Sequence, residues 1–156
     1  MTQHQIALAE RHTLHRAHRE LEHLLARLET TAEVAGMLDA SALAASVASL
    51  LADLEAMLLP HIEWEEQVCF PETDRLAGTP WATQLLRHQH EQIRRRLGQL
   101  RADGLDQVKS HQRAVLELRA HLYVLRALLT SHLEQEEHVL LTLLGTEAVV
   151  AGAKAG

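Results

Sequence analysis

Histidine and glutamate recur in the same arrangement at two places in the chain. His61 is followed four residues later by Glu65, and His132 is followed four residues later by Glu136. On an α-helix, residues four apart are separated by about 40° of rotation and about 6 Å of rise, so each histidine projects beside its glutamate. Such a pair can bind one metal ion or two neighbouring ions. A single pair is also common on helix surfaces, where it adds only about 0.3 kcal/mol.

These two pairs belong to a longer internal repeat. Segment 61–68 matches segment 132–139 at five of eight positions. An earlier histidine, His18 in the first half and His90 in the second, precedes its pair by 43 and 42 residues respectively. Two such pairs, each with a preceding histidine at nearly the same interval, are not expected by chance. It predicts two helical hairpins of one design, each with a histidine on its first helix and the His-x-x-x-Glu pair on its second.

Leucines share the helical faces of both pairs, which places the donors towards the core of a bundle. A carboxylate buried among leucines without a partner would be very costly or would become protonated, and two cations would satisfy both carboxylates. Mixed nitrogen and oxygen ligation favours Fe or Mn, with Zn left open. We therefore predict a dinuclear site in which each carboxylate can bridge, with six ligands: His18, His61, Glu65, His90, His132 and Glu136.

Three further residues near the predicted ligands have other expected roles. His15 lies three residues before His18, about 60° away on the same side, and is a candidate fifth nitrogen. Its counterpart in the second half is Arg87, so the repeat does not support it. Glu66 and Glu137 lie about 140° from the histidines and are expected to face solvent or a neighbouring helix, unless the helix is distorted.

The composition predicts an all-α fold. Apolar residues make up 47% of the 156 residues but aromatics only 3%, and most of the apolar residues are Leu and Ala, which favour helices. Three prolines and seven glycines allow only a few turns, so a bundle with short connections is expected. We predict one domain over residues 1–147 and a flexible tail over residues 148–156.

Capping and breaking residues divide the chain into four expected helices. The second should end at Phe70-Pro71, and Pro60 inside it should cause a kink or a break because proline lacks a donor N–H. The third should begin with Thr79 as its cap and Pro80 at its first position. The expected bounds are Thr2 to about residue 31, Asp39 or Ser41 to Pro71, Thr79 to Gly104, and Ser110 to Leu144.

Charge and hydropathy exclude several classes of protein. The net charge of −6 argues against nonspecific nucleic-acid binding, which needs a positive surface. No stretch approaches 18 consecutive apolar residues, so we expect no transmembrane helix. Cys69 is the single cysteine, which rules out an intrachain disulfide and fits a reducing compartment. With a polar N-terminus that lacks a signal-peptide core, the chain is expected to be cytoplasmic.

The order of these residues resembles the hemerythrin-like proteins, the family of the His–His–Glu cation-binding domain. The matching pattern is His18, His61-x-x-x-Glu65, His90 and His132-x-x-x-Glu136, and it covers about residues 10 to 144. The resemblance implies an up-down-up-down four-helix bundle around a non-haem diiron centre with an oxo or hydroxo bridge. It also implies bridging by both glutamates and chemistry with a small diatomic ligand or peroxide.

The chain departs from the oxygen-carrying members of that family at two positions. Those members have a second histidine one turn after the third-helix ligand, where this chain has Arg94, and an aspartate where it has Glu137. Fewer protein ligands favour reactivity, such as peroxide breakdown, over reversible oxygen carriage. The alternatives are an iron, oxygen or redox sensor whose metal site stabilises the fold, and ferritin-like storage, for which the Glu20-x-x-His23 motif lacks a second copy.

Overall fold

The computed structural model describes residues 3–107 and 112–142, with side chains from 16 to 102, from 114 to 140 and at 142. Within these ranges the chain is helical apart from turns around residues 35–39 and 78–83. The all-α fold class is therefore confirmed. The elements are α1 (Gln3–Val34), α2 (Ala40–Trp64), η1 (Glu65–Cys69), α3 (Phe70–Ala77), α4 (Gln84–Gln107), α5 (Gln112–Glu136) and η2 (Glu137–Leu141), where η marks a π-helix.

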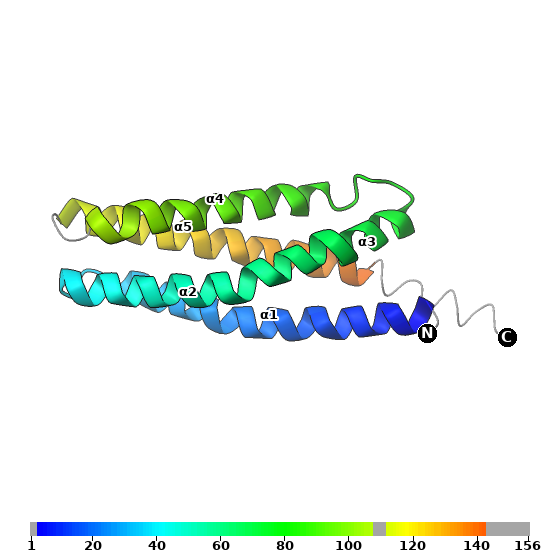
Figure 1. Cartoon of the computed structure of the whole chain (residues 1–156), viewed down its shortest axis with the longest axis horizontal. Coiled ribbons are helices and arrows are strands. Elements are labelled where there is room, and N and C mark those ends of the chain that lie inside the picture. The colour runs from blue at the N-terminus through cyan, green and yellow to red at the C-terminus, as the bar shows by residue number, and fades with distance from the viewer. Residues whose placement is uncertain (1–2, 108–111, 143–156) are drawn as a thin grey trace.

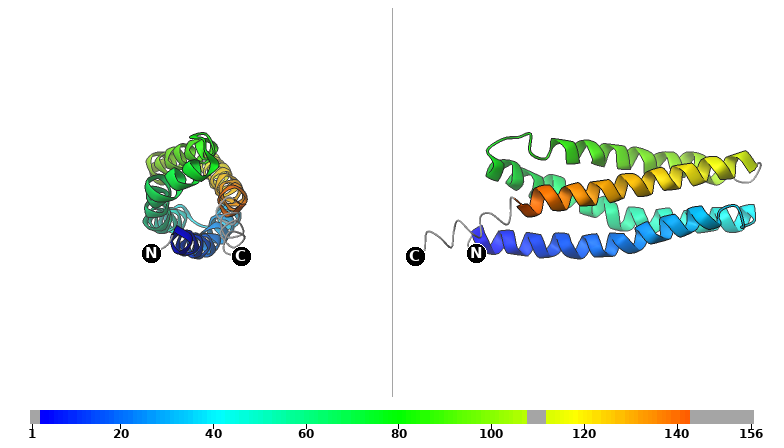
Figure 2. Two further views of the ribbon diagram at one scale, coloured as in Figure 1. Left: turned by 90° about the vertical axis from the view of Figure 1, so that its right-hand side faces the viewer. Right: turned by 180° about the vertical axis from the view of Figure 1, so that it is seen from behind.

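Four long helical segments form an up-down-up-down bundle (Figure 1). Because η1 joins α2 directly to α3, these three elements make one continuous segment that changes direction along its length. Contacts between α1 and α2, α2 and α4, α4 and α5, and α5 and α1 close a ring of four, as the view along the bundle in Figure 2 shows. Each hairpin of the repeat thus supplies two adjacent helices.

The core consists of two clusters of buried apolar side chains. The larger cluster fills the bundle from the donor residues to the end with the α1–α2 turn, and the smaller one lies on the other side of the donors. Burial of these leucines drives the helices together, at roughly 25 cal/mol per Å² of apolar surface removed from water. The smaller cluster consists of Cys69, Phe70, Leu86 and Leu140. The six predicted ligands therefore lie in a polar layer between two apolar layers.

The start of α2 was predicted correctly. Asp39 is the N-cap, and its carboxylate accepts hydrogen bonds from the backbone N–H groups of Ser41 and Ala42 at 2.9 Å. Pro60 lies inside α2 without dividing it. The predicted end at Phe70-Pro71 is wrong, because Pro71 lies in the first turn of α3, where its missing N–H is tolerated.

The predicted bounds of the third helix are also wrong. The α3 segment ends at Gly78, whose φ of 67° is the left-handed conformation of a helix C-cap. The carboxylate of Asp74 then accepts hydrogen bonds from the backbone N–H and hydroxyl of Thr83, and α4 begins only after this anchored residue. At its other end α4 continues past Gly104. The predicted starts at Thr2 and Ser110, the stop after Leu144 and the tail lie outside the described residues.

The segment Ala40–Ala77 is long and apolar enough to cross a membrane by length and composition, with a mean hydropathy of 1.7 in its most apolar window. Core helices of soluble proteins meet the same criterion, so this is weak evidence for a membrane span. The absence of a transmembrane helix stays a prediction from sequence.

Candidate metal centre

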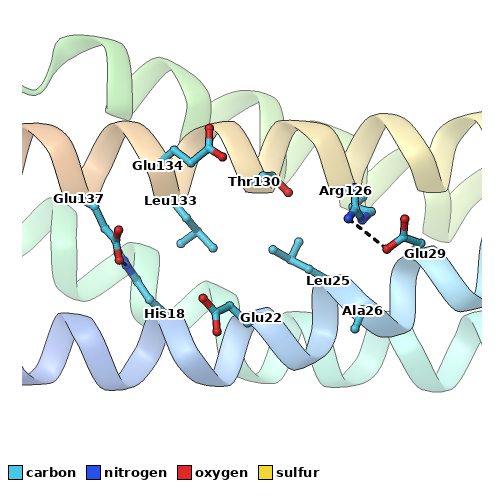
Figure 3. Close-up of a pocket in the computed structure, with 10 residues that line it drawn as sticks. All are labelled: His18, Glu22, Leu25, Ala26, Glu29, Arg126, Thr130, Leu133, Glu134 and Glu137. Atoms are coloured by element: carbon cyan, nitrogen blue, oxygen red, sulfur yellow. Dashed lines mark ion pairs between the residues drawn. The ribbon is translucent and has the colours of Figure 1, made fainter.

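All six predicted ligands lie together at one level of the bundle. His18 projects from α1 towards α5 (Figure 3), and the other donors come from α2, η1, α4 and α5. All six side chains are buried, and Glu65 and Glu136 have no exposed surface. The donor atoms form two overlapping groups, within which they lie no more than 4.8 Å apart. One group is His18, His61, Glu65 and Glu136, and the other is Glu65, His90, His132 and Glu136.

Glu65 lies between histidines of both hairpins. Its Oε1 is 2.8 Å from His61 Nε2, whereas its Oε2 is 3.2 Å from His90 Nε2. The two oxygens of one carboxylate thus face two different imidazoles, one in each donor group. This is the arrangement that a bridging carboxylate requires.

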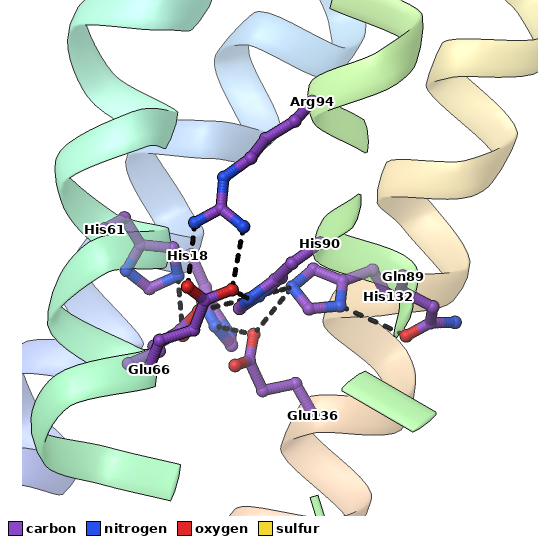
Figure 4. A network of polar contacts seen from close by, with 9 residues as sticks. His18, His61, Glu66, Gln89, His90, Arg94, His132 and Glu136 are labelled. Atoms are coloured by element: carbon purple, nitrogen blue, oxygen red, sulfur yellow. Dashed lines mark hydrogen bonds and ion pairs between the residues drawn. The ribbon is translucent and has the colours of Figure 1, made fainter. Parts of the chain in front are cut away.

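Glu136 occupies the corresponding place on α5. Its Oε2 lies 3.2 Å from His18 Nε2 and 3.5 Å from His132 Nε2, again one histidine from each hairpin (Figure 4). The two carboxylates are shared by both donor groups, while each histidine belongs to one group. The internal repeat of the sequence therefore appears in space as a pair of adjacent half-sites with common glutamates.

The charges of this layer are poorly satisfied by the protein alone. Both oxygens of Glu65, Oε1 of Glu136 and Nε2 of His61 are buried and make no hydrogen bond of good geometry. Burial, and then the negative charge of Glu65, raise the pKa of Glu136 well above its usual value. Burial also opposes ionisation of Glu65, but the close imidazoles of His61 and His90 outweigh it and lower the pKa of Glu65. Bound cations would satisfy both carboxylates, so the residues present fit a metal centre.

His132 has the protonation state that ligation needs, and the rings of His132 and His90 are held in a suitable orientation. Burial, reinforced by the neighbouring His90, lowers the pKa of His132 to about 3, so this imidazole is neutral at physiological pH. Its Nδ1 lies 3.1 Å from Gln89 Oε1, and His90 Nδ1 lies 2.9 Å from Glu66 Oε1. Each ring therefore donates Nδ1–H to an oxygen and turns its Nε2 towards the site, where the two Nε2 atoms lie 3.2 Å apart.

Glu66 faces the neighbouring helix α4, one of the two expected placements, but its contact with a predicted ligand was not foreseen from the sequence. The helix is distorted: η1 begins at Glu65, and the wider π-helical turn carries Glu66 towards α4. There it contacts His90 and also accepts two hydrogen bonds from Arg94, both at 2.9 Å (Figure 4). The Arg94 guanidinium holds the pKa of Glu66 below its usual range. The available signal was the Glu-Glu pair, which the repeat preserves at positions 136 and 137.

Glu137 is the weaker counterpart of Glu66. It begins η2, as Glu66 lies within η1, and its Oε1 is 3.5 Å from His18 Nδ1. Its side chain is 51% exposed, compared with 27% for Glu66. The structure therefore brings Glu136, and not Glu137, into the donor layer.

The remaining histidines are away from the donor layer where their side chains are described. His23, His88 and His138 are exposed, and His121 is partly buried. The side chain of His15 lies outside the described part of the chain, so its candidacy stays a prediction. Among the described residues, only the six predicted donors fall in the two candidate metal groups.

This fold and donor set define a helical bundle with two joined histidine and glutamate groups suited to metal ions. Residues 10–144 match the hemerythrin HHE cation-binding domain, so the chain belongs to this family of metal-binding proteins. Comparisons with curated proteins and with solved structures found no match.

Proposed function

We propose that the six donors hold two iron ions, and that this centre binds or transforms a small ligand such as peroxide, dioxygen or nitric oxide. The single observation that carries the proposal is the position of Glu65 and Glu136, each buried between histidines of different hairpins. Four imidazoles and two carboxylates are a donor set that suits iron, and manganese and zinc are the competing occupants.

The chain's own residues orient the donors and exclude water. Glu66 and Gln89 fix the rings of His90 and His132 through their Nδ1 atoms. The apolar clusters on either side of the donor layer limit the access of bulk water. When bound, a pair of iron ions supplies redox chemistry and coordination positions for a small ligand. Six donors, two of them shared, leave such positions free of protein ligands.

The test is metal content per chain, measured together with an optical spectrum. We expect two iron ions per purified chain and a near-ultraviolet band that shifts when azide or peroxide is added. Evolution of oxygen from peroxide that is lost in His61→Ala would establish an enzyme. Binding of two ions without turnover, with a large loss of helicity on chelation, would instead support the sensor. A protein without bound metal after growth with iron would overturn the proposal.

A further inference from the structure

The repeat creates two equivalent pockets on the bundle, only one of which leads to the donors. One pocket, of about 350 Å³, lies between α1 and α5 (Figure 3), and the other, of about 580 Å³, lies between α2 and α4. Their linings correspond through the repeat: Leu25 of the first matches Leu97 of the second, and Glu134 matches Glu63. The two pockets are therefore the same structural feature with different side chains.

Those side chains give the pockets different charges. The α1–α5 pocket is lined by four glutamates and one arginine, Arg126, which is paired with Glu29 at 3.0 Å. Within the described part of the chain, Glu22 and Glu134 have no ion-pair partner. In the α2–α4 pocket the counterpart of Glu22 is Arg94, and three glutamates face two arginines. The first pocket is thus strongly acidic, and the second is close to balanced.

The pockets also differ in their access to the donors. His18 lines the α1–α5 pocket, and none of the other five donors lines either pocket. The counterpart His90 is covered by the ion pair between Glu66 and Arg94. The His18 side chain is 4% exposed, and its Nδ1 makes no hydrogen bond, with Glu137 Oε1 at 3.5 Å. A buried nitrogen without a hydrogen-bond partner therefore lies at the inner end of an acidic pocket.

We propose that the α1–α5 pocket binds divalent cations transiently and is the route by which they reach the donors. This inference rests on the proposed metal centre. Glu22 and Glu134 attract the ion, and Glu137 passes it to His18. A concave pocket lined by one sign of charge raises the local concentration of counter-ions and accelerates association, by about 10-fold to 1,000-fold in favourable cases. The same charge repels anions, so the observations favour a metal cation as the occupant.

The first test compares uptake of Co²⁺ by the metal-free protein, followed by its visible absorption in stopped flow. Circular dichroism first establishes that each metal-free chain is helical. We expect Glu134→Gln to slow uptake by about 3- to 10-fold at low salt and to leave the final stoichiometry unchanged. Glu63→Gln is the matched control, because it removes the same charge from the equivalent position of the other pocket. Uptake by Glu63→Gln should match wild type.

The second test exchanges the charge at one pair of equivalent positions in the two pockets, 22 and 94. It uses the metal-loaded protein. Glu22→Arg copies Arg94 and places a guanidinium beside Glu137, so release of metal to an external chelator should become slower. Arg94→Glu removes both the cover of His90 and the partner of Glu66, so faster release is expected from either effect, and Glu22→Arg is the variant that tests the route. Both rates are measured on loaded protein, so neither depends on refolding of the metal-free chain.

The outcomes separate the entry route from the metal centre itself. If every variant loads fully and at the rate of wild type, or if Glu63→Gln slows uptake as much as Glu134→Gln, the entry route is wrong and the metal centre stands. Unchanged release in Glu22→Arg would also overturn the route. If no chain takes up metal at all, the proposed function fails and the route fails with it.

Discussion

The two halves of the donor layer share one ligand pattern but differ in the residues that support it. In the His90 half, Glu66 holds the ring and is itself fixed by two hydrogen bonds from Arg94. In the His18 half, the corresponding carboxylate is half-exposed Glu137, at a longer distance. The internal repeat thus has the same donor residues in both halves, whereas the residues around them differ.

The two histidines of the His-x-x-x-Glu pairs also differ in how firmly neighbouring residues hold their rings. The His132 ring is held by Gln89, whose amide nitrogen donates to Gln135 at 3.1 Å. The His61 ring instead faces the indole of Trp64, the counterpart of Gln135, with ring centroids 6.3 Å apart. A ring fixed by hydrogen bonds holds its lone pair in place, whereas a ring packed against an indole is held less firmly. We infer one firmly held ion and one more exchangeable ion.

The largest effect should come from removing a shared carboxylate. Glu65→Ala removes a donor from both groups and leaves Glu136 and the histidines to hold two ions, so we expect both ions to be lost. His18→Ala removes a donor from one group and should leave one ion, held by His90 and His132. Metal content per chain, by elemental analysis after gel filtration, measures the difference. Retention of two ions by Glu65→Ala, or loss of both by His18→Ala, would show that the half-sites are not organised in this way.

The next largest effect should be a loss of metal affinity when the carboxylates beside the histidine rings, Glu66 and Glu137, are replaced. Glu66→Gln removes the charged partner of His90 Nδ1 and leaves Arg94 without its carboxylate, so metal affinity should fall by about 10- to 100-fold. Glu137→Gln should lower it by less than about 5-fold, because Glu137 is exposed and more distant. Affinity is measured by competition with a chromogenic chelator. Equal losses of metal affinity in the two variants would contradict the inference that one ion is held firmly and the other is exchangeable.

The sequence predicted the six residues that meet in the donor layer but not the residues that support them, for a physical reason. Ligand spacing follows from regular helix geometry, which the four-residue interval between His61 and Glu65 encodes directly. The position of Glu66 depends on η1, and a π-helical turn arises from tertiary packing that ideal helix geometry does not include. Gln89 and Arg94 act across helices, so their roles depend on the order in which the helices pack.

The helix ends were likewise predictable only where they depend on local interactions. Asp39 or Ser41 was the expected cap of α2, and Asp39 takes this place through hydrogen bonds that are local, within three residues. The start of α4 was missed because Thr83 is anchored by Asp74, nine residues earlier and on another helix. Local hydrogen bonding is therefore predictable here from single residues, and anchoring between elements is not.

A third prediction concerns the metal-free protein, in which the shared carboxylates repel each other. The pKa of Glu136 is raised by burial and by Glu65, whereas in an unfolded chain glutamate titrates near 4.3. A raised folded-state pKa gives stability that is present below about pH 4 and is lost as pH rises through that pKa. Glu136→Gln cannot ionise, so its stability relative to wild type should increase from pH 5 to pH 8. Thermal unfolding with chelator present measures this, and a constant difference across the range would contradict it.

The smallest expected effect is that of Arg94 on stability. Arg94→Gln removes two hydrogen bonds to Glu66, but the Arg94 side chain is 41% exposed, so solvent screening limits the loss of unfolding free energy to about 1 kcal/mol or less. The pair should matter more for metal affinity, because Arg94 fixes Glu66 and Glu66 fixes His90. Arg101→Gln is a suitable control, since its ion pair with Glu55 joins α4 to the same continuous α2–η1–α3 segment without contacting a donor. Denaturant unfolding should therefore not distinguish the two variants, while chelator competition should show weaker metal binding only in Arg94→Gln. If both variants bind metal as wild type does, Arg94 merely covers the pocket, and the firmness of the His90 half comes from Glu66 alone.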